Sequence, residues 1–427
     1  PNGVLFAPGA QIDVGSLVAT SLNADVAQFM AGRLRLFGGS PASGDVVNEG
    51  RITAAPGGHV VLVGPRVTNR GSIEALGGTI GLAAGNAVTV DATGSGLLDI
   101  QVPVAAIDAR LEHSGRLIAD GGMVSLQAAA VDAARRTVMQ IDGVVRAQRI
   151  ENKGGQIVLS GGDSGIVQVS AALDASAPNG QGGEIRVLGE RVALVGQARL
   201  DASGALGGGS VLVGGNLRGQ GVEPNAKATY VGRDVTLDAS ATARGDGGRV
   251  VVWSDEHTTY AGQSRATGGA IGGDGGLVEV SGKQTLDFQG GADLRAPLGR
   301  TGTLLLDPVS IEIGVVADVN GDSTAGDDLA TNILLASDFP SSVSFITANT
   351  VATLLSTADV DLHASSSITV SAPLTVPAGG ALSTLTLDAP VVSISAPMTL
   401  NNSSLAITTA GGDVAVTADL QTNHSVS

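Results

Sequence analysis

Four segments of the chain share one pattern: two glycines, one variable residue and a short run rich in β-branched residues. The four segments are residues 182–187, 208–213, 247–252 and 275–280. Successive copies begin 26, 39 and 28 residues apart. Recurrence every 20–50 residues or so is typical of a chain that stacks one supersecondary unit on the next. The pattern therefore predicts a solenoid.

Shorter repeats extend this pattern toward the N-terminus. Residues 48–54 recur as residues 69–75, and residues 114–126 repeat the same order of turn, strand, Gly-Gly and strand. Short strands with alternating apolar side chains and glycine corners are typical of one coil of a β-solenoid, and corner glycines supply positive φ angles without steric cost. We expect an all-β fold, a right-handed single-stranded parallel β-helix with short extra-helical hairpins and loops. The handedness rests on the general preference of parallel crossovers.

The composition fits a narrow core with sharp corners. The 427 residues include 63 Gly, and 43% are hydrophobic but only 2% aromatic, so Val, Ile, Leu and Ala must fill the interior. Thick globular cores use more large aromatic residues. The chain has no Cys, which excludes disulfides and thiolate metal sites.

Charge limits the partners and divides the chain. The net charge of −16 argues against nucleic acid and anionic membranes, and no apolar run approaches the ~20 residues that span a bilayer. After Arg300 there is no Lys or Arg, while twelve acidic residues remain. We therefore expect Gly-rich coils over residues 111–303 and an acidic, Ser- and Thr-rich continuation of the solenoid over residues 304–427.

Two segments interrupt the coils, and a third segment has the pattern of a helix. Residues 127–140 break the glycine rhythm and are expected to protrude as a hairpin. Residues 217–230 form a long insertion between two coils, and such insertions are common binding sites in solenoids. Residues 347–356 carry a helical pattern in which Thr347 is the N-cap.

Two short motifs are candidate binding sites. Arg244, Gly245 and Asp246 spell the integrin-binding tripeptide, and the alternative interpretation is an ordinary coil corner.

Asp318, Asn320 and Asp322 have the spacing of the first ligands of an EF-hand calcium loop. The usual Gly and Glu of such a loop are replaced by Ser323 and Leu329, so a solvated acidic loop is the alternative. Ca²⁺ is the one cofactor that the sequence offers.

Trp253 is the only Trp of the chain and follows a predicted inward-facing strand. A packed corner is one interpretation. A partner-binding patch formed with His257 and Tyr260 is the other, because aromatic residues are rare here and enriched at interfaces.

A β-helix can also carry an enzyme, such as a polysaccharide lyase or hydrolase. Such sites need clustered carboxylates with a Lys, Arg or His on neighbouring coils. The five His and three Lys are scattered along this sequence. We therefore expect no enzyme and assign no catalytic residue.

The opening residues 1–21, which read PNGVLFAPGAQIDVGSLVATS, resemble the secretion domain of two-partner secretion exoproteins, the filamentous-haemagglutinin-like proteins. Pro1, Asn2 and Gly3 match three of the four leading residues of that family's signature. Ser16 stands where Gly is commoner. With the Gly-Gly coils, the resemblance to adhesin-type members covers most of residues 1–310.

The resemblance implies a Gram-negative exoprotein that is exported through an outer-membrane barrel transporter and folds as a β-helix at the cell surface. Residues 1–110 would be the remainder of the secretion domain, without its N-terminal cap and with an unpaired edge on its first coil. The implied role is attachment to a host or bacterial surface through a receptor that the sequence does not identify. The alternative is capture of haem or a haem carrier through a protruding loop such as residues 217–230.

Overall fold

The computed structural model describes residues 2–30, 34–38, 43–92, 98–104, 108–131, 137–150, 155–315, 343–379 and 382–425. The chain forms two units. Unit 1 contains residues 1–193 and 197–202, and unit 2 contains residues 194–196 and 203–427. Strand β23 (Arg191–Leu194) lies at the boundary. No helix within the described ranges is long and apolar enough to cross a bilayer.

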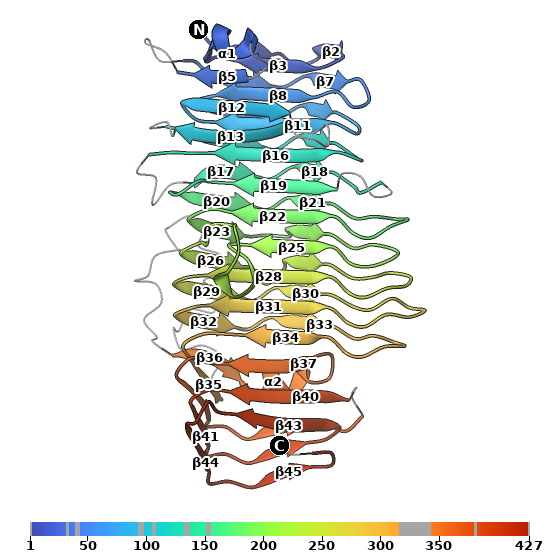
Figure 1. Ribbon diagram of the computed structural model, residues 1–427, viewed down its shortest axis with the longest axis vertical. Coiled ribbons are helices and arrows are strands. Elements are labelled where there is room, and N and C mark those ends of the chain that lie inside the picture. Colours follow the sequence, from blue (N-terminus) through green and yellow to red (C-terminus); the bar gives the residue numbers. More distant parts are fainter. Residues whose placement is uncertain are drawn as a thin grey trace. The chain divides into compact units, whose positions relative to one another are not determined.

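Unit 1 is a stack of short strands that form three parallel sheets (Figure 1). The first sheet contains β1 (Val4–Phe6), β6 (Val46–Asn48), β9 (Arg66–Asn69), β14 (Arg110–His113), β17 (Thr137–Ile141) and β20 (Ile166–Val169). The second contains β2 (Gln11–Val14), β7 (Arg51–Ala54), β10 (Ser72–Glu74), β15 (Arg116–Ile118), β18 (Val144–Arg146), β21 (Ala172–Asp174) and β24 (Arg199–Asp201). The third contains β3 (Leu17–Thr20), β8 (Val60–Gly64), β11 (Thr79–Ala84), β16 (Met123–Ala128), β19 (Gln156–Ser160) and β22 (Glu184–Leu188).

The repeats of the sequence lie directly above one another. Ile52 of β7 pairs with Ile73 of β10, which pairs with Leu117 of β15. All three side chains are fully buried. An aliphatic side chain therefore stacks on its equivalent in the next coil, and the predicted parallel β-helix is confirmed.

The second glycine of a Gly-Gly corner is required because the backbone of the preceding coil lies too close for a Cβ atom. A Cβ atom on Gly122 would collide with the carbonyl oxygen of Gly78, and one on Gly78 would collide with that of Gly58. In unit 2, Gly276 lies in the same way against the carbonyl of Gly248. Positive φ, the reason expected from the sequence, applies to the first glycine of some corners, such as Gly121 at +75°.

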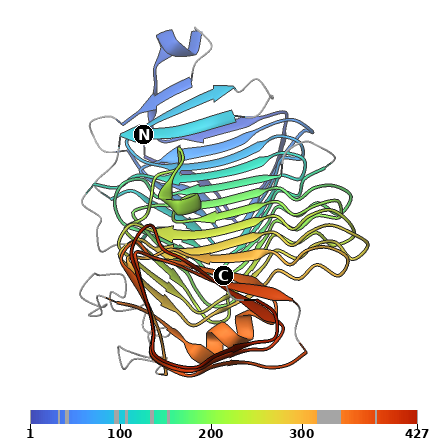
Figure 2. The same ribbon diagram turned by 60° about the horizontal axis from the view of Figure 1, so that its bottom comes forward.

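A fourth sheet, which is antiparallel, covers part of unit 1. Its strands are β4 (Asn23–Ala24), β5 (Leu34–Phe37), β12 (Ala87–Ala92) and β13 (Leu98–Val104), and the short helix α1 (Val26–Met30) lies between β4 and β5 (Figure 2). Leu36, Val88 and Ile100 of this sheet pack with Val61 and Val63 of β8 in one apolar cluster. The cluster buries apolar residues on the outer side of the third sheet.

Unit 2 repeats the three-sheet arrangement. The first sheet contains β26 (Ala228–Val231), β29 (His257–Tyr260), β32 (Thr285–Phe288), β36 (Ser344–Thr347), β35 (Ser310–Gly314), β38 (Ser367–Val370), β41 (Val391–Ile394) and β44 (Asp413–Val416). The second contains β27 (Thr236–Asp238), β30 (Gln263–Arg265) and β33 (Gly291–Asp293), and a separate sheet contains β39 (Leu374–Val376), β42 (Met398–Leu400) and β45 (Leu420–Thr422). The third contains β25 (Ser210–Val213), β28 (Arg249–Ser254), β31 (Leu277–Gly282), β34 (Thr303–Leu306), β37 (Asp359–His363), β40 (Ser383–Asp388) and β43 (Ser403–Thr408).

The helix predicted in the acidic region is confirmed. Helix α2 (Ala348–Leu354) contacts both β33 and β39 (Figure 2), and Thr347 caps it by accepting a hydrogen bond from the Thr350 N–H. The change of composition near residue 304 does not interrupt the solenoid, because β34 pairs with β31 on one side and β37 on the other.

The two predicted interruptions differ from what the structure describes. Gln127 and Ala128 end strand β16, and residues 137–140 belong to β17, so these parts of the expected hairpin are coil strands. Residues 132–136 lie outside the described ranges. The second interruption is a loop between β25 and β26 that includes the 3₁₀ turn η1 (Leu217–Gly219) and ends before Ala228.

Candidate functional site

The N-terminal signature lies within the first coil of unit 1. Gly3 has φ +105°, a conformation that glycine favours, and a Cβ atom there would lie 2.7 Å from the carbonyl oxygen of Asp45. The next residue, Val4, donates its N–H to that same oxygen at 2.9 Å. A Cβ atom on Gly44 would in turn collide with the backbone of Asn2. The Asn2–Gly3 pair therefore fits backbone to backbone against the following coil, and Pro1 lies outside the described ranges.

The rest of the signature forms β2, a turn and β3. Ser16, the departure from the family pattern, accepts a hydrogen bond from the His59 N–H at its Oγ, 3.0 Å away. Leu17 donates its N–H to the carbonyl of the same His59. The Ser16 hydroxyl thus links the first coil to the next.

Large apolar side chains are exposed near this end of unit 1. Leu5, Val26, Phe29 and Met30 are each more than half exposed. The last three belong to α1, none of whose residues is buried. This surface is a candidate contact region that the sequence analysis did not identify.

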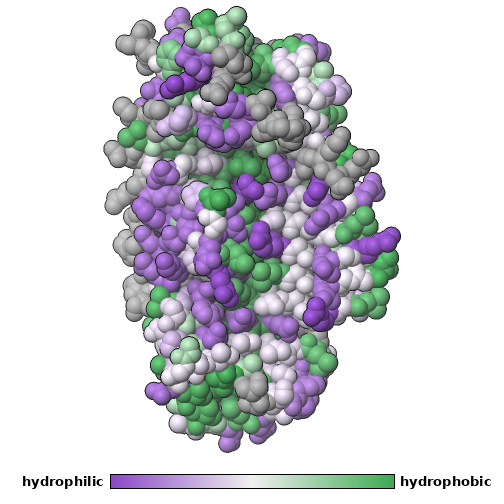
Figure 3. All heavy atoms as spheres, viewed as in Figure 1, coloured by the Kyte–Doolittle hydropathy of each residue, from purple (hydrophilic) through white to green (hydrophobic). Residues whose placement is uncertain are grey.

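Unit 2 also exposes apolar residues, on its last coils. Val391 of β41 and Val414 and Val416 of β44 are between two-fifths and one-half exposed. Figure 3 shows apolar atoms gathered at the lower end of the face drawn, toward these strands.

The integrin-like tripeptide lies at an exposed corner of unit 2. Arg244 and Asp246 are exposed, and Gly245 has φ +93°. Asp246 Oδ1 accepts a hydrogen bond from the Asp274 N–H at 2.8 Å. Asp274 itself binds Arg300, with its Oδ2 2.6 Å from the Arg300 Nη2. The Asp246 carboxylate therefore already links two corners, while the Arg244 guanidinium is exposed to solvent.

The prediction that Trp253, His257 and Tyr260 form a partner-binding surface patch is wrong, because all three side chains are buried. Tyr260 is fully buried, stacks on Phe288 with ring centroids 5.3 Å apart, and shares a 2.6 Å hydrogen bond with Ser264. His257 is 7% exposed and Trp253 is 4% exposed. Burial lowers the pKa of His257 to about 3. Tyr260 is packed against Phe288, His257 is held by Thr285 and Thr259, and the loop before β26 covers Trp253.

The covering loop of Trp253 is held by a ring of polar contacts. Trp253 donates from Nε1 to Asp255 Oδ1 at 3.1 Å, and Asn225 donates from Nδ2 to that same oxygen at 3.1 Å. Asn225 Nδ2 also donates to the carbonyl of Gly219 at 3.0 Å. Leu217 packs against the Trp253 side chain. The loop is therefore an ordered cover rather than a protruding arm.

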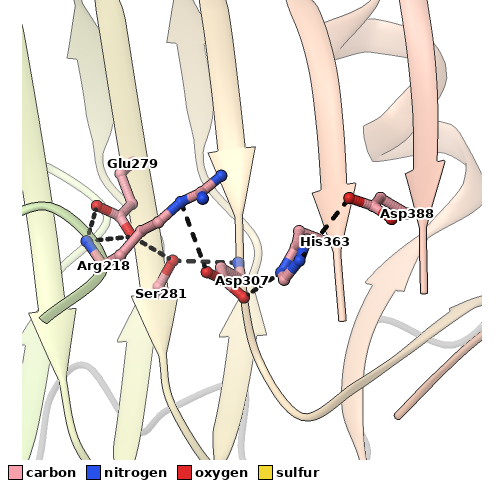
Figure 4. A network of polar contacts seen from close by, with 6 residues as sticks. All are labelled: Arg218, Glu279, Ser281, Asp307, His363 and Asp388. Carbon is pink, nitrogen blue, oxygen red and sulfur yellow. Dashed lines mark hydrogen bonds and ion pairs between the residues drawn. The ribbon is translucent and has the colours of Figure 1, made fainter. Parts of the chain in front are cut away.

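A fully buried carboxylate, Glu279, lies beside this loop (Figure 4). Its two oxygens accept the Arg218 N–H at 3.1 and 2.9 Å, and Oε1 accepts the Ser281 hydroxyl at 3.2 Å. Burial raises the pKa of Glu279 to about 7, although these donors oppose the shift. Ser281 Oγ accepts the Asp307 N–H at 3.1 Å, which extends the network to the next strand.

The network continues across β37 and β40. His363 Nδ1 lies 2.6 Å from Asp307 Oδ1, and its Nε2 lies 3.8 Å from Asp388 Oδ2 (Figure 4). Burial raises the pKa of the neighbouring Asp361. Sequence analysis did not identify this cluster, and its one signal is the single Glu between Val278 and Val280 in an apolar strand.

No metal centre emerges from the described part of the chain. No group of three or more His, Asp or Glu side chains there is placed to hold a metal ion. The candidate calcium ligands Asp318, Asn320 and Asp322 lie outside the described ranges, so that site stays a prediction.

Comparison with known families identifies the N-terminal part of the chain. The model of the TPS secretion domain matches residues 1–174. Residues 1–174 thus carry the secretion domain that characterises two-partner secretion exoproteins. The match extends beyond residue 110, where the sequence analysis ended this domain. Such exoproteins are secreted to the surface of Gram-negative bacteria, and the resemblance seen in residues 1–21 is confirmed.

Two proteins of Haemophilus influenzae are similar to this chain. The crystal structure of the HMW1 secretion domain matches with a TM-score of 0.61 and 28% identity, over 71% of this chain and 78% of that one. This likeness therefore extends past residue 174. The Heme/hemopexin-binding protein is 28% identical over 169 residues, which are 38% of this chain and 18% of that protein. The matched segment thus spans less than a fifth of that curated relative.

Proposed function

We propose that this exoprotein is exported by a dedicated outer-membrane transporter and then attaches the bacterium to host cells, other bacteria or surfaces. The observation that carries the proposal is the match of residues 1–174 to the TPS secretion domain. The transporter is the partner that such a domain requires. The attachment role rests on the β-helix, whose apolar side chains fill the interior and whose corners and side loops meet the surroundings.

The role we propose is not enzymatic. Glu279 and His257, two groups with strongly perturbed pKa values, are buried in hydrogen-bonded packing. Catalytic groups of perturbed pKa need access to a substrate. Their burial therefore supports a structural role for these side chains.

Adhesion is tested with the purified full chain coated on a surface. The expected result is more attached host cells or bacteria than on an albumin-coated surface, and loss of the excess when soluble chain is added. No excess on any cell type contradicts the attachment role.

The variant Asp246→Glu separates the two interpretations of the tripeptide, because integrin recognition requires the shorter carboxylate. Unchanged attachment of host cells excludes the tripeptide as the attachment site, which must then lie on another surface of the chain.

Capture of a haem carrier is the second candidate, favoured by the name of the Heme/hemopexin-binding relative. Direct haem ligation needs an accessible imidazole. His257 uses both ring nitrogens, on Thr285 and Thr259, and His113 is also buried and doubly bonded. These two imidazoles are therefore not free to ligate haem, and the target that we propose is the carrier protein. Retention of haem-loaded haemopexin, but not of free haem, on immobilised chain is the expected result, and failure to retain the carrier removes this candidate.

A further inference from the structure

The loop of residues 216–225 in unit 2 covers an apolar surface on the outer side of the third sheet. Leu217 packs against Leu212, Val251 and Trp253, which form one buried cluster. Outward-facing residues of a solenoid normally meet water, so these three are buried only because the loop lies on them. Figure 1 shows the loop in green across β28.

The loop fits this surface closely and in a demanding backbone conformation. A Cβ atom on Gly219 would lie 2.5 Å from the Trp253 ring. Arg218 has φ +54°, which is uncommon for a residue other than glycine. Asn216 supports the turn by accepting the Leu217 N–H and by donating to Glu223 Oε2 at 2.6 Å. Packing and side-chain contacts thus hold a backbone turn that is not favoured by itself.

Glu279 is the ionisable group that the loop contacts. The N–H of Arg218 is directed at both of its oxygens (Figure 4). On the neighbouring strands, the residues directly opposite Glu279 are Val251 and Leu305, which carry no charge.

The charged groups around Glu279 partly cancel. Arg218 from the loop favours the ionised carboxyl, and Asp307 after β34 disfavours it. The Arg218 guanidinium forms an ion pair with Asp307, at 3.9 Å between Nε and Oδ2. Beyond Asp307 lie His363 and Asp361 of β37. Loss of hydration therefore decides the state of Glu279.

The closed loop and the proton on Glu279 stabilise each other. With the loop closed, the pKa of Glu279 is about 7, and an exposed Glu has a pKa of about 4.5. Protons therefore bind more tightly to the closed form. By linkage, full ionisation shifts the equilibrium toward an open form by up to about 300-fold, the factor that corresponds to the difference of these two pKa values.

We propose that the loop of residues 216–225 is a pH-dependent cover, closed while Glu279 is protonated and opening as its carboxyl ionises. Opening hydrates the carboxylate and uncovers Leu212, Val251 and Trp253 as an apolar contact surface. The device goes beyond the proposed attachment role and does not depend on it.

Trp253 reports the opening directly, because it is the only Trp of the chain. The experiment measures acrylamide quenching of its fluorescence in the full chain from about pH 5 to about pH 9. The expected result is a severalfold rise of the quenching constant with a midpoint near neutral pH. A quenching constant that stays flat over this range overturns the proposal.

The variant Glu279→Gln keeps the shape and an acceptor oxygen but cannot ionise. The expected quenching constant of this variant is low at every pH. The matched control is Glu312→Gln, which changes a Glu that accepts a hydroxyl hydrogen bond from Ser371 on another sheet of unit 2. The control is expected to titrate like the unmodified chain. A rise in Glu279→Gln equal to that of the unmodified chain overturns the proposal.

Limited trypsin digestion of the unmodified chain is a second readout that needs no variant. Cleavage after Arg218 requires the loop to leave the surface, whereas Arg233 lies in an exposed turn and serves as the internal reference. The expected result is a severalfold rise in the ratio of the two cleavage rates between about pH 6 and about pH 8.5. A constant ratio contradicts opening.

Discussion

Asn69 donates a hydrogen bond from Nδ2 to Nδ1 of His113, 3.0 Å away, across two neighbouring coils of unit 1. Asn48 donates to Asn69 Oδ1 at 2.7 Å in the same direction. An amide nitrogen can only donate, so His113 Nδ1 accepts and its Nε2 carries the proton toward the carbonyl of Val144, at 3.3 Å. One corner of the β-helix is thus joined by a buried, neutral chain of side-chain hydrogen bonds.

Replacing Asn69 by Ala breaks this chain in the middle. Asn48 and His113 are both buried, and each loses a partner, so we expect the free energy of unfolding to fall by roughly 2–3 kcal/mol. Urea unfolding measures the change. Asn23→Ala, at an exposed position of β4, is the control and is expected to change little. Equal effects of the two substitutions would contradict the stabilising role assigned to this chain of side-chain hydrogen bonds.

Acid destabilises the fold through its buried imidazoles. The pKa of His257 in the folded chain is about 3, below its ordinary value of 6.5, because the ring is buried. Below pH 6.5 the unfolded chain binds a proton that the folded chain does not. The free energy of unfolding therefore falls by about 1.4 kcal/mol for each pH unit from this group.

Glu279 opposes this fall in the free energy of unfolding over part of the pH range. Its pKa in the folded chain, about 7, lies above the ordinary 4.5, so it contributes stability at low pH that is lost as pH rises toward 7. We expect Glu279→Gln to show the steeper loss of stability between about pH 6.5 and about pH 4.5. Urea midpoints across this range give the two slopes, and a shallower slope in the variant contradicts the assignment.

The close approach of corner glycines in neighbouring coils predicts an effect that depends on the position substituted. Gly122→Ala places a Cβ atom against the carbonyl of Gly78, and the backbone must shift, so the expected loss of stability is ~2–4 kcal/mol. Gly15→Ala is the matched control, because a Cβ atom there has no neighbour within 4 Å, and its expected effect is within about 0.5 kcal/mol. Thermal unfolding distinguishes them, and a tolerated Gly122→Ala would show that the coils do not approach as described.

The cover of Trp253 predicts a local effect of Gly219→Ala. The added methyl group meets the indole ring, so we expect the loop to be displaced and acrylamide quenching of Trp253 to rise at every pH. Val222→Ala changes a side chain of the same loop that is 95% exposed, and it is expected to leave quenching unchanged. Similar quenching in both variants would mean that the contact does not hold the loop.

The sequence predicted the coils because their cause is local and repeated. Each Gly-Gly corner places its strand in register with the previous copy, as Val250 of β28 pairs with Val278 of β31. Thr347 was identified as an N-cap for the same reason, since the capping hydroxyl and the Thr350 N–H are three residues apart.

The segments that pack on the outside of the coils, the antiparallel sheet and the loop of residues 216–225, could not be predicted in this way. Leu36 and Ile100 join one cluster from strands more than sixty residues apart. Alternation in β31 places Glu279 on the outer side, where a carboxylate normally meets water. Its burial depends on Arg218, 61 residues earlier in the chain, and no local pattern reports such a contact. The sequence therefore predicts the β-helical coils but not the segments that pack on their outer surface.

The most direct measurement of the account is secretion of the full chain, carrying an inner-membrane export signal, from a Gram-negative host with and without a transporter of the two-partner class. The account predicts folded, protease-resistant chain in the culture medium only when the transporter is present. Equal amounts in the medium without the transporter, or retention in the periplasm with every transporter of this class, would contradict it.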